Sequence, residues 1–284
     1  LTTASIFQKV ISFFYFILVA RLVGDTNTGI YFFAIVFTTI FTVVADVGFG
    51  SVLTREAARY PDKSESYFRV IFTSKLVFGI IAYALVVLLA NILNYSSVLK
   101  TLIYISGITM YFDNLTTAFN SIFRSKKNLI FESIGIVVSQ FLTLVIGTIA
   151  LLNHWPLTWL ILAYTIPSSL NFVYSVVVIR KIYRFNGLFG WNGQIFKTLI
   201  LIAAPFALAS IIGRLYSYSD SLLMSKLLTE QELGWWSVPY KIVFAFQFIP
   251  IALSTSVYPA FSSLFIADKN KISELFIKSW RYLF

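Results

Sequence analysis

Residues 29–53 read GIYFFAIVFTTIFTVVADVGFGSVL, and Asp46 is the only charged residue in this stretch. A helix needs about 20 mostly apolar residues to cross the hydrocarbon core of a bilayer, so the stretch is long enough to span it. A strand of a membrane barrel would alternate apolar and polar residues, and this stretch is continuously apolar instead. It therefore predicts a membrane-spanning helix.

Runs of the same kind recur along the chain. Hydrophobic residues make up 58% of the 284 positions and charged residues 12%, which is about half the charged fraction of a typical soluble domain. A soluble protein of this size could not bury so much apolar surface in one core. We expect an all-α integral membrane protein with eight spans and the start of a ninth near Ile272. The other seven spans are 2–22, 68–91, 98–122, 129–152, 156–179, 196–224 and 233–264.

Basic residues in the connections predict the orientation, because cytoplasmic loops carry an excess of Lys and Arg. The connections after the second, fourth, sixth and eighth spans hold fifteen of them, whereas the opposite side holds Arg21, Lys100 and Lys226. This asymmetry places the N-terminus and those four connections in the cytoplasm. The net charge of +10 is explained by these topology signals, so we expect no nucleic-acid partner.

A short pattern recurs at an offset of 205 residues. Ala20-Arg21-Leu22-Val23 with Asp25, Gly29 and Tyr31 matches Ser225-Lys226-Leu227-Leu228 with Glu230, Gly234 and Trp236. Six predicted spans separate the two copies, an even number, so both enter the membrane in the same direction. This is the parallel kind of transporter repeat, whose pseudo-twofold axis runs along the membrane normal.

The repeat predicts a multi-helix bundle of two parallel six-helix repeats around a central cavity. Residues 1–190 would form the complete first bundle, and residues 191–284 the truncated start of the second. The chain begins at Leu1 rather than Met and stops at Phe284 within an apolar stretch. We therefore expect a fragment that is truncated at both ends.

The same offset pairs two cations within apolar spans, Lys9 and Arg214. Charged groups at mid-membrane cost about 3 kcal/mol on insertion scales and usually serve function. We interpret both, with Lys241 as a weaker third, as cations that line the cavity and bind substrate. The alternatives are that Lys9 extends to the cytoplasmic surface and that Arg214 pairs with Asp220 or another helix. Polar neighbours at helical spacing support the first interpretation: Thr2, Ser5 and Ser12, and Ser210, Ser217 and Ser221.

Acidic and amide residues are candidates for the same cavity or for ion coupling: Asp46, Asp113, Asn114, Asn120 and Asp220. Asp46 would balance Lys9 or bind a coupling cation, or it would pair with Arg55. The second half of span 98–122 is polar, which fits either a pathway-facing helix or hydrogen bonding between helices. We expect Lys75 to extend to the interface and Glu132 to be interfacial. The chain has no Cys and one His, His154, so we predict no catalytic residue, no metal site and no cofactor.

Four stretches carry a family resemblance: Ala20-Arg21-Leu22-Val23-Gly24, Gly29-Ile30-Tyr31, Asp46-Val47-Gly48-Phe49-Gly50 and Thr54-Arg55-Glu56-Ala57-Ala58-Arg59. This pattern resembles the start of the polysaccharide biosynthesis proteins. They include Wzx-type flippases of O-antigen and capsule precursors, within the multidrug, oligosaccharidyl-lipid and polysaccharide exporter superfamily. The basic turn at residues 124–127 is similar as well. The resemblance covers nearly the whole chain in span order.

The resemblance implies two six-helix bundles whose cavity opens alternately to each side of the cytoplasmic (inner or plasma) membrane. It implies a flippase rather than an enzyme, with a polyprenyl-diphosphate-linked oligosaccharide as substrate. Membrane lipid and other polysaccharide-assembly membrane proteins would be its partners. A diphosphate needs paired cations to leave water, so Arg214, Lys9 and Lys241 would hold it.

Two other functions stay open. A cation-coupled multidrug exporter of the same superfamily would favour carboxylates in its cavity over Lys and Arg. A membrane-embedded glycan ligase or polymerase would carry a large extracytoplasmic loop, and the outer connections here are short. Coupling to Na⁺ or H⁺ through Asp46 or Asp113 is also left open.

Overall fold

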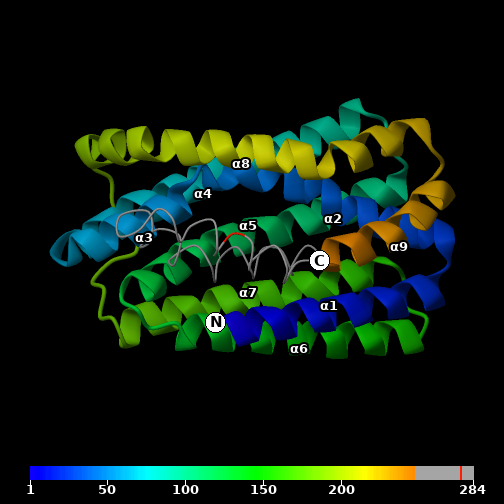
Figure 1. Cartoon of the computed structure of the whole chain (residues 1–284), viewed down its shortest axis with the longest axis horizontal. Helices are drawn as coiled ribbons and strands as arrows, with labels where there is room; N and C mark the ends of the chain where they lie inside the picture. The colour runs from blue at the N-terminus through cyan, green and yellow to red at the C-terminus, as the bar shows by residue number, and fades with distance from the viewer. Residues whose placement is uncertain (247–275, 277–284) are drawn as a thin grey trace. The chain divides into compact units, whose positions relative to one another are not determined.

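The computed structural model describes residues 1–246 and Phe276, and these residues are almost entirely helical (Figure 1). Since these residues contain helices and no strand, the predicted all-α class is confirmed. The helices are α1 (Thr2–Val23), α2 (Asp25–Asp46), α3 (Phe49–Arg59), the 3-10 helix η1 (Pro61–Lys63), α4 (Ser64–Ile92), α5 (Ser97–Ser125), α6 (Ile130–Leu152), α7 (Thr158–Lys181), α8 (Gly193–Leu227) and α9 (Glu230–Phe246).

Six of the described helices are long and apolar enough to cross a membrane: α1, α2, α4 with the preceding η1, α6, α7 and α8. Helix α5 has 29 residues, so it is long enough too, but the polar residues of its second half lower its hydropathy. The eighth predicted span, 233–264, is described only to Phe246, within α9. The ninth, near Ile272, lies outside the described residues. The chain is a multi-pass membrane protein.

Residues 29–53 do not form one continuous helix, and this prediction is wrong at both ends. Helix α2 begins at Asp25, one residue after α1, because Gly24 turns the chain with φ +83°. It ends at Asp46, where Val47 (φ +48°) and Gly48 (φ +76°) adopt left-handed conformations before α3 starts at Phe49. A left-handed residue commonly ends a helix. The sequence hides this break because Val47 continues the apolar pattern.

Helix α5 is the centre of the helical packing. It contacts α2, α3, α4 and α7, while α6 pairs with α1 and α7 (Figure 1). Helix α8 lies against α2, α3 and α4. Aromatic side chains fill the core between α3, α4 and α5: Phe49, Phe68, Phe72, Phe119 and Phe123.

Polar caps define several helix starts. The Asn192 side chain accepts the backbone N–H groups of Gln194 and Ile195 at 3.0 Å, at the start of α8. At the start of α9, Glu232 accepts the Thr229 backbone N–H at 2.8 Å, and Thr229 Oγ1 accepts the Glu232 N–H at 3.3 Å. This reciprocal arrangement is a capping box, which satisfies two N–H groups that the helix leaves free.

The chain divides into two compact units, Leu1–Ser237 and Val238–Phe284. The first unit contains α1 to α8 and the first half of α9. The expected boundary between two bundles at residues 190 and 191 rests on the sequence repeat, and it stays a prediction.

Candidate functional site

A carboxylate lies at the break between α2 and α3. Asp46 is the last residue of α2, and its Oδ1 accepts the backbone N–H of Gly50 at 3.3 Å, in the first turn of α3. A negative charge beside the N-terminus of a helix, here α3, is stabilised by the helix dipole. The sharp turn through Val47 and Gly48 thus brings Asp46 to the N-terminus of the next helix.

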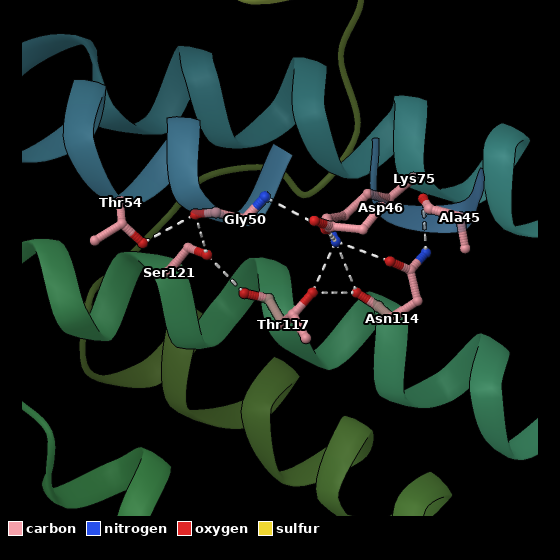
Figure 2. Close-up of polar contacts among 8 residues, drawn as sticks. All are labelled: Ala45, Asp46, Gly50, Thr54, Lys75, Asn114, Thr117 and Ser121. Atoms are coloured by element: carbon pink, nitrogen blue, oxygen red, sulfur yellow. Dashed lines mark hydrogen bonds and ion pairs between the residues drawn. The ribbon is translucent and has the colours of Figure 1, made fainter. Parts of the chain in front are cut away.

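The partner of this carboxylate is Lys75 of α4 (Figure 2). The Lys75 side chain has no exposed surface. The Lys75 ammonium forms a salt bridge with Asp46. It also donates to Thr117 Oγ1 at 2.7 Å, to Asn114 Oδ1 at 2.8 Å and to the Asn114 carbonyl at 3.1 Å. A buried charge is tolerated only when it is paired and hydrogen bonded, and here both conditions hold. One lysine therefore joins α2, α4 and α5.

The polar contacts continue along α5 toward α3 (Figure 2). Asn114 Nδ2 donates to the carbonyl of Ala45 at 3.2 Å, and Ser121 Oγ donates to the carbonyl of Gly50 at 2.9 Å. These bonds bind α5 to the backbone on both sides of the α2–α3 break. We call the group of Asp46, Lys75, Asn114 and Thr117 the buried polar cluster.

The structure corrects two expectations about these charges. Lys75 does not extend to the interface, because the α2–α3 break places a carboxylate within its reach inside the bundle. Asp46 pairs with Lys75 and not with Arg55, whose guanidinium binds Glu56 at 2.9 Å.

Glu132 was expected at the interface; it lies in the first turn of α6, and its depth in the membrane stays a prediction. Its side chain is 2% exposed. Arg124, at the end of α5, binds both of its oxygens, with Nε to Oε2 at 2.8 Å and Nη2 to Oε1. Bidentate pairing of this kind is among the stronger ionic interactions. It fastens α6 to the end of α5.

The polar second half of α5 has two faces. Asn114, Thr116 and Ser121 are buried, which fits hydrogen bonding and packing between helices. Asp113 and Thr117 are exposed and Asn120 is half-buried. Steps of four and three residues place these last three on one side of the helix. We call Asp113, Thr117 and Asn120 the open face of α5.

The carboxylate of the open face is held differently from Asp46. Asp113 accepts a hydrogen bond from the hydroxyl of Ser168 in α7. One turn away, the hydroxyls of Thr109 and Thr165 lie 2.7 Å apart and tie the same two helices. Of the ion pairs found among the described residues, none involves Asp113.

The predicted cavity cations lie in different environments. Lys9 is exposed on α1, and Arg214 is half-buried on α8. The Arg214 guanidinium lies 5.9 Å from the centre of the Tyr218 ring. Asp220 accepts the backbone N–H of Ser221 at 2.6 Å, and the described ion pairs do not include Arg214 with Asp220. Lys241 is half-buried on α9 in the second unit, and a common cavity for these cations stays a prediction.

The open face of α5 offers the carboxylate of Asp113 and the amide of Asn120, while the Thr117 hydroxyl is engaged by Lys75 and the Asn114 carbonyl. Carboxylates and amides bind the hydroxyls of a sugar or a cation. Within the described residues, no group of three or more His, Cys, Asp or Glu side chains could hold a metal ion.

The sequence interpretation missed the pairing of Lys75 with Asp46. The two residues are on different helices, and no local pattern connects them. A usable signal did exist, because each is a lone charge inside an apolar span and opposite charges within a membrane usually pair.

Solved transporters share this architecture. A structure described as the MATE multidrug transporter DinF-BH has a TM-score of 0.64 at 14% identity, over 99% of this chain and 68% of that chain. An inward-facing multidrug resistance MATE family transporter of the MOP superfamily has a TM-score of 0.66 at 12% identity, over 96% and 66%. A third chain, described as protein A, has a TM-score of 0.69 at 14% identity, over 94% and 64%. This chain thus spans about two thirds of the length of the solved structures it matches.

The likeness to these structures shows a MATE transporter fold. Among curated proteins, no sequence matches the chain significantly. The family of polysaccharide biosynthesis proteins matches residues 1–265, which confirms the resemblance seen in the sequence. The chain belongs to the polysaccharide biosynthesis protein family.

Proposed function

We propose that the protein is a flippase that moves a polyprenyl-diphosphate-linked oligosaccharide across the cytoplasmic membrane, for cell-surface polysaccharide biosynthesis. The observation that carries this proposal is the family match over residues 1–265, on a chain with a transporter fold. The flippase works by alternating access, with its N-terminus in the cytoplasm, and forms no covalent bond with its substrate.

Arg214 and Lys9, with Lys241 as a third, hold the diphosphate in this proposal. An anion leaves water only when cations replace its hydration. Lys75 is excluded from this role because its ammonium is fully occupied within the buried polar cluster. Lys9 is exposed and Arg214 is half-buried, so both retain accessible surface.

The open face of α5 contacts the sugar. Exposed polar groups within a membrane helix normally face water or a protein interior rather than lipid. Asp113 and Asn120 supply hydrogen-bond acceptors and donors for sugar hydroxyls. If transport is coupled to Na⁺ or H⁺, Asp113 is the carboxylate that we assign to the ion, because Asp46 is engaged by Lys75.

The test is deletion of the full-length gene in its host, followed by measurement of lipid-linked glycan precursors on each membrane face. We expect precursors to accumulate on the cytoplasmic face and surface glycan to be lost. Wild type should restore export, whereas Arg214→Ala and Lys9→Ala should not. Arg180→Ala and Lys181→Ala are the matched controls, since both residues are exposed at the end of α7, and they should restore export fully.

A multidrug exporter is the second candidate, and a specific observation favours it. Asp113 is an exposed carboxylate with no ion-pair partner among the described residues, as a site for cationic drugs would require. If the deletion leaves surface glycan normal and changes only drug sensitivity, the exporter hypothesis replaces the flippase. If instead glycan chains reach the surface but are not joined or ligated, a ligase or polymerase is indicated.

A further inference from the structure

Two glycines touch where α2 and α9 begin. A Cβ atom built on Gly29 would lie 2.7 Å from the backbone N of Gly234, and closer still to the carbonyl oxygen of Glu230. A Cβ atom built on Gly234 would lie 2.8 Å from the carbonyl carbon of Asp25 and 3.2 Å from the backbone N of Gly29. Real Cβ atoms do not approach backbone so closely. The two helices can meet in this way only because both positions lack a side chain.

The contact is reciprocal. Gly29 faces the first residue of α9, Glu230, and Gly234 faces the first residue of α2, Asp25. The offset of 205 residues seen in the sequence repeat relates Gly29 to Gly234 and Asp25 to Glu230. Glycines commonly allow such close helix crossings in membranes. The two equivalent hairpins, α1–α2 and α8–α9, therefore meet through equivalent residues.

Polar contacts surround the crossing. Trp235 Nε1 donates to Asp25 Oδ2 at 2.8 Å, and Ser96 Oγ donates to Glu230 Oε1 at 2.8 Å. Lys226 donates to the carbonyl of Leu93, and its ammonium lies 4.0 Å from the centre of the Tyr95 ring. The α8–α9 turn is thus tied to the α1–α2 turn and to the α4–α5 connection.

The start of α9 is itself well defined. The hydrogen bonds from the Thr229 backbone N–H and hydroxyl lower the pKa of the Glu232 carboxyl, so Glu232 stays ionised and holds the capping box closed. Glu230 and Gly234 are therefore presented to α2 on a defined first turn.

These contacts differ in strength. The polar bonds are exposed, and exposed hydrogen bonds and charge contacts contribute about 1 kcal/mol or less each. The glycine crossing is a steric fit that admits no added atom. Closure at this point therefore has a strict geometric requirement, while the bonds that hold it are weak enough to be broken readily.

We propose that the Gly29–Gly234 crossing is the outer gate of the transporter and that the structure shows this gate closed. The inference rests on the proposed alternating access. Its position follows from the distribution of Lys and Arg, which places the α1–α2, α4–α5 and α8–α9 connections on the side opposite the cytoplasm. A Cβ atom on either glycine holds the hairpins apart and prevents closure.

The test is cysteine cross-linking across the gate in the full-length protein. This chain has no cysteine, and any beyond it are replaced first. Ser96→Cys and Glu230→Cys are introduced together and treated with a short bis-methanethiosulfonate in membranes. We expect rapid cross-linking with both glycines present, and a rate about tenfold or more lower with Gly29→Ala or Gly234→Ala, as overpacking of a tight contact predicts. Gly213→Ala is the matched control, because a Cβ atom there meets nothing within 4 Å.

Equal cross-linking rates in the parent double-cysteine protein and in its Gly29→Ala, Gly234→Ala and Gly213→Ala variants would overturn the proposal, provided that the glycine variants elute as single monodisperse species. If they do not, Trp235→Phe takes their place, since it removes only the bond to Asp25. It should slow cross-linking about two- to fivefold, the loss of one hydrogen bond, and an unchanged rate would overturn the proposal. The cross-linking rate needs no substrate, so it tests the gate independently of the deletion experiment, which tests the cargo.

Discussion

Asp46→Asn should destabilise the protein more than Lys75→Met does, although both changes break the same salt bridge. The reason is a difference in burial. The Lys75 side chain has no exposed surface, whereas that of Asp46 is 35% exposed. Each single change leaves one charge without its partner, and the cost depends on how well the remaining charge can be solvated.

The magnitudes follow from the contacts that each variant retains. In Asp46→Asn, the Lys75 ammonium stays fully buried with only neutral oxygens around it, and we expect a loss of about 3–5 kcal/mol in the free energy of unfolding. In Lys75→Met, water partly solvates Asp46, which also keeps the Gly50 N–H. Asn114 Oδ1 loses its donor, so the loss is about 2–3 kcal/mol.

The double variant Asp46→Asn with Lys75→Met removes both charges together. Its loss in the free energy of unfolding should be smaller than the sum of the two single losses by at least about 2 kcal/mol, because neither charge is left unpaired. The assay is equilibrium unfolding of the purified protein in mixed micelles, with tryptophan fluorescence as the readout. Lys126→Met is the control, because Lys126 is exposed and its removal should change stability by less than about 0.5 kcal/mol.

Two results would refute this reasoning. Additive effects of the single changes would show that the two charges do not interact in the folded protein. A greater loss for Lys75→Met than for Asp46→Asn would show that the stated difference in burial does not govern the cost.

Three further predictions concern other parts of the molecule. Arg124→Ala leaves Glu132 buried and unpaired, so in the same assay it should cost about 2–3 kcal/mol; a loss below about 0.5 kcal/mol on the same scale would contradict the ion pair. Val47→Gly should be about 1 kcal/mol more stable than Val47→Ala, because both lose the side chain that packs against the core and only Gly adopts φ +48° without strain; equal stability of the two variants would argue against strain. Asp113→Asn should reduce glycan export while the unfolding free energy stays within about 1 kcal/mol of wild type, and buried Thr116→Val should show the opposite pattern; export and stability falling together in both would remove the distinction between the two faces of α5.

The class of protein could be predicted from the sequence with little error. Hydrophobic runs long enough for a bilayer are a local property, and the helices found at 2–23, 64–92, 97–125, 130–152, 158–181 and 193–227 correspond to predicted spans. The break after Asp46 was missed, because Val47 is apolar and its left-handed backbone cannot be read from hydropathy. Gly48 and Gly50 nearby were the only sign of it.

The partners of the charged residues could not be predicted, because they depend on how distant helices pack. Lys75 meets Asp46 only because α2 ends at the break, and Glu132 meets Arg124 only because α6 folds back against the end of α5. The polar residues of α5 were visible in the sequence. Which of them face neighbouring helices and which form the open face depends on the rotation of α5 about its axis, and packing against α2, α3, α4 and α7 decides that.

The sequence by itself determined a helical membrane protein of the polysaccharide biosynthesis family and an offset of 205 residues between Gly29 and Gly234. It did so because apolar length and a repeated pattern are properties of the chain alone. Only the tertiary structure decided that these two glycines touch and that Lys75 is buried against Asp46. Contacts of this kind are set by the close approach of helices, and that approach depends on the packing of the whole bundle rather than on any one segment.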